Sequence, residues 1–290
     1  MCDQDQLRIW AKDALNRRQF GAMAGAGALA ACAPMETGNM GAPLSLTERR
    51  VTFPAGNHTI DGFFVAPEGR ESPAVLFWPD IAGLREAKRN MARRLAGEGY
   101  AVFVINPYYR DVSGEQFANF AEFAASGGFE KVKPWRAKFD SDSTAFTARH
   151  VLDFLDAQPE VDSDRPFGTQ GYCMGGPLAL WTAAAHDARF GAAASFHGGG
   201  LVRDDTRTSP SVVIRNTDVD YLVAIAKNDD AKDPDHKGIL ANSVESAGDN
   251  SKVAVYDGDH GWTVPDSPAY AAVAAEKAYA DLIAIYADAL

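Results

Sequence analysis

Cysteine, clustered basic residues and long apolar runs are all scarce in this chain. Three cysteines in 290 residues are too few for a disulfide framework. Basic residues number 28 against 39 acidic ones, and an acidic chain with a net charge of −11 and no basic stripe repels a phosphate backbone. We therefore expect no nucleic-acid partner. The apolar fraction of 46% and the charged fraction of 23% are typical of a globular protein and exclude a disordered, collagen-like or polytopic membrane chain.

Sequence patterns that bind metals or nucleotides are absent as well. The chain has no His-Glu-x-x-His motif, no Cys-x-x-Cys motif and no cluster of carboxylates with the spacing of a metal site. The glycine run at 198–200 lacks the spacing of a phosphate-binding loop. We expect neither a metal nor another cofactor.

The beginning of the chain resembles an export signal. Arg17 and Arg18 precede an uncharged run rich in Gly and Ala at 20–31, which is too short to span a bilayer, where about 20 apolar residues are needed. This order resembles a twin-arginine signal, and the sequence at 29–32 matches a bacterial lipobox. Asn16 departs from the pattern, where Ser or Thr is more usual. The alternative is a Gly/Ala-rich leader or a short amphipathic helix.

Processing at such a signal would remove residues 1–31 and leave Cys32 as a lipid-modified N-terminus. Residues 32–49 would then form a tether, and the protein would be an exported, periplasmic or cell-envelope lipoprotein that meets the membrane only through the lipid on Cys32. Cys2 is lost with the signal, so Cys173 remains as the only free thiol. A lone thiol in an oxidising compartment is a liability unless it is buried or functional.

Residues 50–290 alternate between strand and helix patterns and predict one α/β domain. The expected strands are 50–53, 62–66, 74–78, 101–105, 166–172, 192–196, 221–226 and 252–256. The expected helices are 85–98, 144–157, 176–188, 235–247 and 267–289, the last with Pro268 in its first turn. Apolar strands separated by helices predict a doubly wound, mostly parallel sheet with helices on both faces, opened by an antiparallel hairpin. The Phe- and Gly-rich segment 111–140 is expected to be a loop or short helix that caps the site, with plain loop packing as the alternative.

The motif most indicative of chemistry is Gly-Tyr-Cys-Met-Gly-Gly at 171–176, between a predicted strand and a predicted helix. This is the layout of a nucleophile elbow, with Cys173 in the place where most α/β hydrolases have serine. Gly171 and Gly175 remove side chains from the crowded positions on either side of the nucleophile. The helix N-terminus favours a thiolate and an oxyanion, which makes the N–H of Met174 the expected first oxyanion donor. The alternative for Cys173 is a small buried apolar residue.

A base and an acid follow the last strands in the order that α/β hydrolases use. His260 lies in a polar, Gly-rich loop directly after the final strand. Asp229 and Asp230 follow the strand at 221–226, and we expect Asp229 to be the acid, with Asp230 as the alternative. Either carboxylate could instead be solvated or cap the next helix. His197 also ends a strand at this edge, and for it we favour loop packing over lining the pocket.

These features together resemble the dienelactone hydrolases, the cysteine-nucleophile branch of the α/β hydrolases. The resemblance covers roughly residues 50–290 and depends on five segments: Trp-Pro-Asp-Ile-Ala-Gly-Leu at 78–84, Gly-Tyr at 99–100, Asn-Pro-Tyr-Tyr-Arg at 106–110, the motif at 171–176 and Asp-His-Gly at 259–261. It implies an α/β-hydrolase fold and a Cys173–His260–Asp catalytic triad.

The resemblance also implies roles for three further residues. Asp80 matches an acidic residue that pairs with the resting thiol, although the family has Glu there. Ile81 would supply the second oxyanion N–H, and Arg110 matches an arginine that binds a substrate carboxylate. A second such arginine, expected shortly after the catalytic histidine, is replaced here by the sequence Trp-Thr-Val-Pro at 262–265, which makes dienelactone itself doubtful as a substrate.

The predicted function is hydrolysis of an ester or a lactone through a thioester on Cys173, with a small molecule as the substrate. One alternative is a non-catalytic surface lipoprotein that uses the same scaffold for binding. A thiol redox protein is a weaker alternative, because no resolving cysteine is present. The sequence specifies neither the substrate nor the oligomeric state.

Overall fold

The computed structural model describes residues 44–204 and 207–290. The predicted export signal, the lipid-modified Cys32 and most of the predicted tether lie outside these residues. Within the described residues, no helix is both long and apolar enough to cross a membrane.

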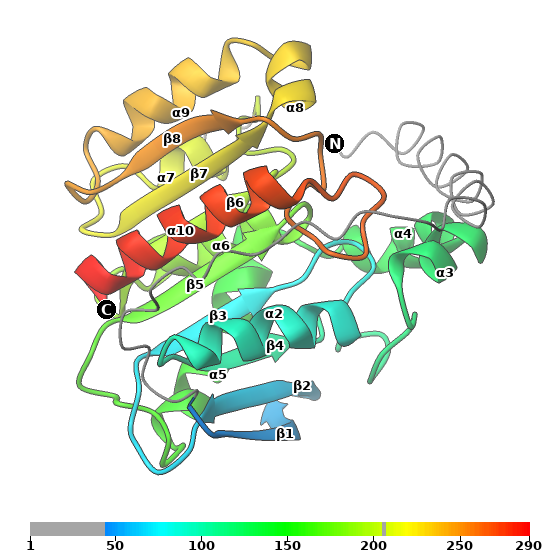
Figure 1. Cartoon of the computed structure of the whole chain (residues 1–290), viewed down its shortest axis with the longest axis vertical. Helices are drawn as coiled ribbons and strands as arrows, with labels where there is room; N and C mark the ends of the chain where they lie inside the picture. Colours follow the sequence, from blue (N-terminus) through cyan, green and yellow to red (C-terminus); the bar gives the residue numbers. More distant parts are fainter. Residues whose placement is uncertain (1–43, 205–206) are drawn as a thin grey trace, which may run out of the picture.

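The centre of the molecule is a sheet of eight strands in the order β1-β2-β4-β3-β5-β6-β7-β8 (Figure 1). The strands are β1 (Leu46–Ala55), β2 (His58–Pro67), β3 (Ala74–Trp78), β4 (Ala101–Ile105), β5 (Phe167–Tyr172), β6 (Phe190–Phe196), β7 (Asp220–Ala226) and β8 (Lys252–Tyr256). β1 and β2 form an antiparallel hairpin, β2 pairs antiparallel with β4, and all other pairs are parallel. The predicted α/β-hydrolase fold is confirmed.

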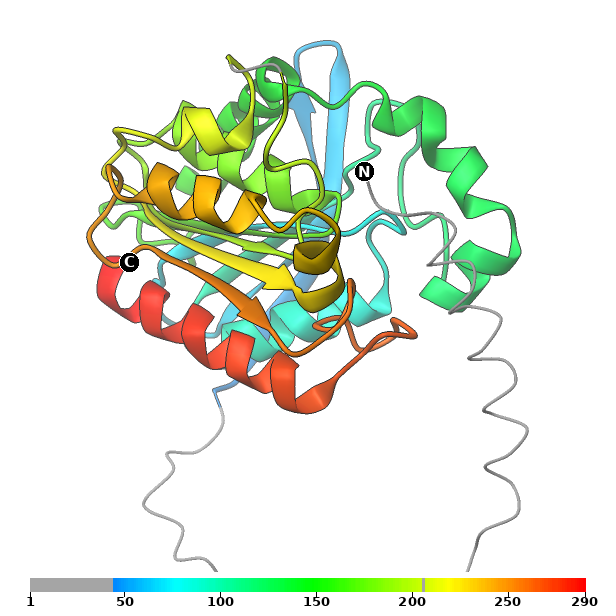
Figure 2. The ribbon, with the colours of Figure 1, turned by 90° about the horizontal axis from the view of Figure 1, so that it is seen from above.

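Helices cover both faces of the sheet (Figures 1 and 2). The helices are α2 (Glu86–Gly97), α3 (Phe120–Ala125), α4 (Gly128–Arg136), α5 (Ser141–Asp156), α6 (Gly175–Ala185), α7 (Pro210–Val213), α8 (Lys227–Lys232), α9 (His236–Val244) and α10 (Ala272–Ala289). Helices α5, α6 and α9 pack on one face in one apolar core, and α2 and α10 pack on the other face in a second core. The central strands β3, β4 and β5 are therefore buried along their whole length, whereas the edge strands β1 and β8 are partly exposed.

The predicted boundaries of the first strand and of the closing helix were wrong. β1 begins at Leu46, inside the predicted tether, because its residues pair along the whole length of β2. The closing helix α10 begins at Ala272 and not at residue 267, so Pro268 precedes it. The reason is that residues 262–271 form turns: the Tyr270 N–H donates to the Ser267 carbonyl, and the Ala271 N–H donates to the Trp262 carbonyl.

The segment at 111–140 forms two short helices, α3 and α4, beyond the carboxyl ends of the parallel strands (Figure 1). Its apolar side chains form a third core with residues around the motif at 171–176: Ile81, Ala82, Tyr108, Phe117, Phe120, Phe123, Phe129, Val132, Cys173 and Met174. Burial of one such phenylalanine contributes about 1.5–3 kcal/mol. We call residues 111–140 the cap, since they cover Cys173 as the sequence analysis predicted.

Candidate active site

Cys173 occupies a strained turn between β5 and α6. Its backbone φ is +53°, a left-handed conformation that is costly for a residue with a side chain. A Cβ on Gly171 would lie 1.9 Å from the Gly175 carbonyl oxygen, and a Cβ on Gly175 would lie 2.4 Å from the Trp78 carbonyl oxygen. The predicted reason for glycine at both positions is therefore confirmed: a sharp turn here has no room for side chains.

The backbone N–H groups of Ile81 and Met174 lie near this turn. Met174 is the N-cap of α6, and its N–H precedes the first intrahelical bond. Ile81 follows β3, where the next N–H, of Ala82, donates to Asp80 Oδ1 at 3.0 Å. Within residues 44–204 and 207–290, no protein acceptor takes the N–H of Ile81 or of Met174. Both groups are therefore available to bind a negatively charged oxygen.

His260 is held in place by two residues of the segment that follows β7. Its ring Nδ1 lies 2.7 Å from Asp229 Oδ2, and its backbone N–H donates to Asn228 Oδ1 at 2.8 Å. The ring is buried, with the side chain 8% exposed. Because Nδ1 is engaged by the carboxylate, proton exchange with a reacting group would take place at Nε2.

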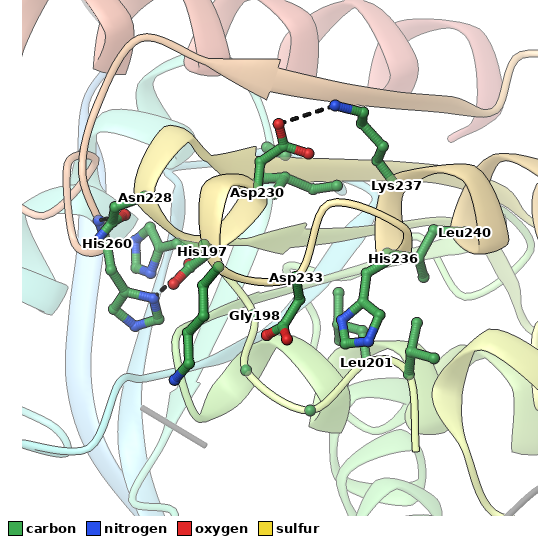
Figure 3. Close-up of a pocket in the computed structure, with 17 residues that line it drawn as sticks. His197, Gly198, Leu201, Asn228, Asp230, Asp233, His236, Lys237, Leu240 and His260 are labelled. Carbon is green, nitrogen blue, oxygen red and sulfur yellow. Dashed lines mark hydrogen bonds and ion pairs between the residues drawn. The ribbon is translucent and has the colours of Figure 1, made fainter. Parts of the chain in front are cut away.

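Asp229 and Asp230 contact different partners, and Figure 3 shows the ion pair of Asp230 with Lys237. Asp230 Oδ2 lies 2.9 Å from Lys237 Nζ, in the first turn of α9, whereas the carboxylate of Asp229 contacts His260. Of the two carboxylates that the sequence analysis considered, Asp229 is the one that the geometry brings to His260.

A cavity of about 20 Å³ brings most of the predicted residues together. Its walls include Asp80, Ile81, Phe120, Cys173, His197 and His260. Cys173 is only 4% exposed, because the cap covers it. Thus the thiol, the imidazole and one of the two N–H donors share one small space although they come from distant parts of the chain.

His197 lies in the wall of this cavity, contrary to the loop-packing role that we favoured from the sequence. Its ring centroid is 5.0 Å from that of His260, and its Nε2 lies 2.9 Å from Thr263 Oγ1. Burial lowers the pKa of His197 well below its usual range, as does the nearby His260, so the ring is neutral. A left-handed φ of +41° at the end of β6 places it there. Sequence reasoning had no signal for this conformation.

The predicted partner of the thiol, Asp80, is already held by two cations. Its Oδ1 lies 2.8 Å from Arg85 Nη1, and its Oδ2 lies 2.7 Å from Lys88 Nζ. Burial alone would raise the pKa of the Asp80 carboxyl, but the charges of Arg85 and Lys88 outweigh that effect and lower the pKa well below its usual range. Asp80 is therefore a carboxylate at all physiological pH values. No local sequence pattern marks Arg85 or Lys88 as a partner of Asp80.

Arg110 lies against α5 and lines none of the cavities described here. Its Nη2 donates to the Ser143 carbonyl at 2.8 Å and to Thr147 Oγ1 at 2.9 Å, and its guanidinium also lies over the ring of Tyr109. These contacts favour a packing role, and the role in binding a substrate carboxylate stays a prediction. The alternative to that role is a surface ion pair with Asp111 or Glu115, but both carboxylates are paired with other residues.

We expect Arg110→Ala to lower kcat/KM by similar factors for matched carboxylate-bearing and neutral esters. The loss of two hydrogen bonds to α5 should also lower the free energy of unfolding by about 1–3 kcal/mol. Steady-state kinetics with both esters, together with denaturant unfolding, measure the two effects. A loss of about 10- to 100-fold confined to the charged ester would instead assign Arg110 to the substrate carboxylate.

A larger cleft of about 440 Å³ opens beside His260 (Figure 3). It is bounded by the loop at 197–202 and by residues of α8 and α9, and its charged side chains are Asp229, Asp230, Lys232, Asp233 and Lys237. In the described part of the chain, no three His, Cys, Asp or Glu side chains are grouped so that they could hold a metal ion.

The sheet order, the strained turn before α6 and the position of His260 after β8 define an α/β hydrolase. The chain belongs to the dienelactone hydrolase family, which it matches over residues 60–290.

Relatives of known name agree with this assignment at low identity. A protein of Yersinia pestis, provisionally named carboxymethylenebutenolidase, is 23% identical over 236 residues, which are 79% of this chain and 83% of the relative. A protein of Escherichia coli K12 with the same provisional name is 24% identical over 234 residues, which are 79% of this chain and 82% of the relative.

Solved structures show the same fold. A protein of Klebsiella pneumoniae, provisionally named dienelactone hydrolase, superposes with a TM-score of 0.68 at 19% identity, over 84% of this chain and 99% of the other. A dienelactone hydrolase-like promiscuous phosphotriesterase from metagenomic libraries gives a TM-score of 0.62 at 22% identity, over 84% of this chain and 98% of the other.

Proposed function

We propose that this chain hydrolyses esters or lactones, with Cys173 as the nucleophile, His260 as the general base and acid, and Asp229 as the residue that orients His260. The observation that carries the proposal is the 2.7 Å contact between His260 Nδ1 and Asp229 Oδ2, on a histidine that shares a cavity with the strained Cys173. A hydrolase of this family implies a small-molecule substrate.

The first half of the reaction forms a thioester. His260 Nε2 takes the thiol proton, and the Cys173 sulfur forms a bond to the carbonyl carbon of the substrate. The carbonyl oxygen becomes an oxyanion that accepts hydrogen bonds from the Ile81 and Met174 N–H groups. When the intermediate collapses, the bond from carbon to the leaving oxygen breaks, and His260 returns its proton to that oxygen.

The second half reverses these roles with water. His260 takes a proton from a water molecule, and the hydroxyl oxygen bonds to the thioester carbon. The C–S bond then breaks, the acid leaves, and the sulfur regains the proton from His260. Asp229 stabilises the imidazolium in both halves and stays ionised.

The direct test is a panel of p-nitrophenyl esters and small lactones, assayed with and without iodoacetamide. We expect hydrolysis that the reagent abolishes, with substrate protecting Cys173 from alkylation. Ester hydrolysis that iodoacetamide leaves intact would contradict the proposed nucleophile. The absence of any turnover would favour the alternative of a binding protein.

We also propose that the protein is exported and anchored by a lipid on Cys32, which is supported by the sequence around Arg17, Arg18 and Cys32. Cys32→Ala should move the protein from the membrane fraction to the soluble fraction, because the anchor is lost, and the double lysine replacement of Arg17 and Arg18 should block export. Fractionation with immunoblotting measures both. A native protein that is uncleaved and wholly cytosolic would overturn this proposal.

A further inference from the structure

A cluster of buried charges lies behind the thiol, and the reaction steps above leave it without a role. The side chains of Arg85 and Lys88 are 0% exposed, and that of Asp80 is 5% exposed. The guanidinium of Arg85 forms two bonds to the Asp80 carboxylate, at 2.8 and 3.0 Å, and Lys88 Nζ is 2.7 Å from the same carboxylate. Taking two cations and a carboxylate out of water costs free energy, which only close ion pairs such as these offset.

The second carboxylate on Arg85 connects this cluster to the cap. Arg85 Nε and Nη2 each lie 2.7 Å from an oxygen of Asp266, which follows His260 in the chain. Asp266 Oδ2 also accepts the N–H of Phe120 at 2.9 Å, and Phe120 lines the thiol cavity. Arg85 therefore joins three segments around Cys173: the one that holds Ile81, the one that follows His260, and the cap.

We propose that Arg85 and Lys88 are positioning residues of the hydrolase: they hold Asp80 as a fixed carboxylate that accepts the Ala82 N–H and so fixes the backbone at Ile81, and they direct the thiol proton to His260 rather than to Asp80. This inference depends on the proposed function, in which Cys173 is the nucleophile. For Asp80 to pair with the thiol instead, its carboxylate would have to give up bonds to two buried cations, of which only Arg85 has a second carboxylate, Asp266, to compensate it. Asp80 in this chain is thus an anchor and not the thiol's partner.

Several charged and titratable groups from different segments of the chain lie around the cavity of Cys173. Asp80, His197 and His260 line its cavity, and behind them lie Arg85 and Lys88 on the side of α2. Lys88 Nζ is 4.7 Å from the ring centroid of Tyr172, the neighbour of Cys173 in the chain. Asp229 binds His260, and Asp266 binds Arg85. Because Lys88 is buried and binds a carboxylate that lines the cavity of Cys173, its charge should stabilise the thiolate.

The first experiment measures the pH dependence of Cys173 alkylation by iodoacetamide, followed by mass spectrometry of the peptide that contains Cys173, in the full chain. For Lys88→Met we expect the midpoint to rise by about one pH unit, because a buried positive charge is lost. We expect kcat for a p-nitrophenyl ester to fall by about 10- to 100-fold with little change in KM, because the Ile81 N–H is displaced. The matched control is Lys277→Met, an exposed lysine on α10, which should change neither quantity.

A second variant separates positioning from charge. Arg85→Lys retains the positive charge but loses the planar group that binds Asp80 and Asp266 together. We expect kcat to fall by about 10-fold while the alkylation midpoint stays unchanged. If Lys88→Met does not fold, the kcat of Arg85→Lys alone tests the proposed positioning role.

The inference is overturned if a folded Lys88→Met keeps both its alkylation midpoint and its kcat, or if Arg85→Lys keeps its kcat. Failure of the proposed function would look different: hydrolysis by the unsubstituted chain would then be insensitive to iodoacetamide, while the alkylation midpoint would still report the charge near Cys173.

Discussion

Replacing Cys173 with alanine is expected to lower kcat/KM for every ester substrate by about three to six powers of ten, because removal of a nucleophile removes the covalent pathway as a whole. The protein should remain folded. Alanine keeps the Cβ at the same left-handed φ of +53°, and the side chain at this buried position becomes smaller and not larger. Steady-state kinetics and a thermal melt measure the two quantities.

The serine variant at the same position serves as a matched control. Cys173→Ser preserves the size of the side chain and a proton for His260 to take, so weak activity is expected, above that of the alanine variant. Near-native turnover in Cys173→Ala with a normal melting temperature would show that another group attacks the carbonyl.

Replacing Asp229 with asparagine should have the second-largest effect. We expect kcat to fall by about 10²- to 10⁴-fold, because an amide neither stabilises an imidazolium nor holds the ring nitrogen in the same tautomer. KM should change little, since Asp229 acts through His260 and stabilises a charge that forms during the reaction. The kinetics of both constants measure the effect.

Asp230→Asn is the control for this prediction, because the two carboxylates are neighbours on α8 with different partners. It removes only an ion pair with Lys237, whose side chain is half exposed, and such pairs contribute about 0–1 kcal/mol. We expect kcat to stay within about threefold of the unsubstituted chain. A larger loss for Asp230→Asn than for Asp229→Asn would assign the acid to Asp230.

The fold and three site positions followed from local sequence signals. Cys173, Asp229 and His260 each follow a predicted strand, and parallel strands bring their carboxyl ends to one edge of the sheet. The glycines beside Cys173 indicated the strained turn because crowding there depends on neighbours close in sequence. These features are predictable because they require only the alternation of strands and helices.

The remaining features depend on contacts between distant segments. Arg85 and Asp266 meet only when the loop after β8 folds back over α2, and no local pattern marks either residue as a partner of the other. By its position in the chain Arg110 matches a substrate-binding residue of the family. The direction of its side chain, however, is set by hydrogen bonds to α5. The start of α10 was placed too early because a proline is compatible with a first helical turn and with the preceding loop alike.

The most direct test of the central claim is to trap the acyl-enzyme. The full chain is mixed with an excess of a slowly deacylating p-nitrophenyl ester, the early release of p-nitrophenol is followed, and the quenched protein is digested and analysed by mass spectrometry. The thioester mechanism predicts a burst of about one equivalent and an acyl group on the peptide that contains Cys173, both absent from Cys173→Ala. Turnover without this adduct, continuing in the alanine variant, would contradict the mechanism.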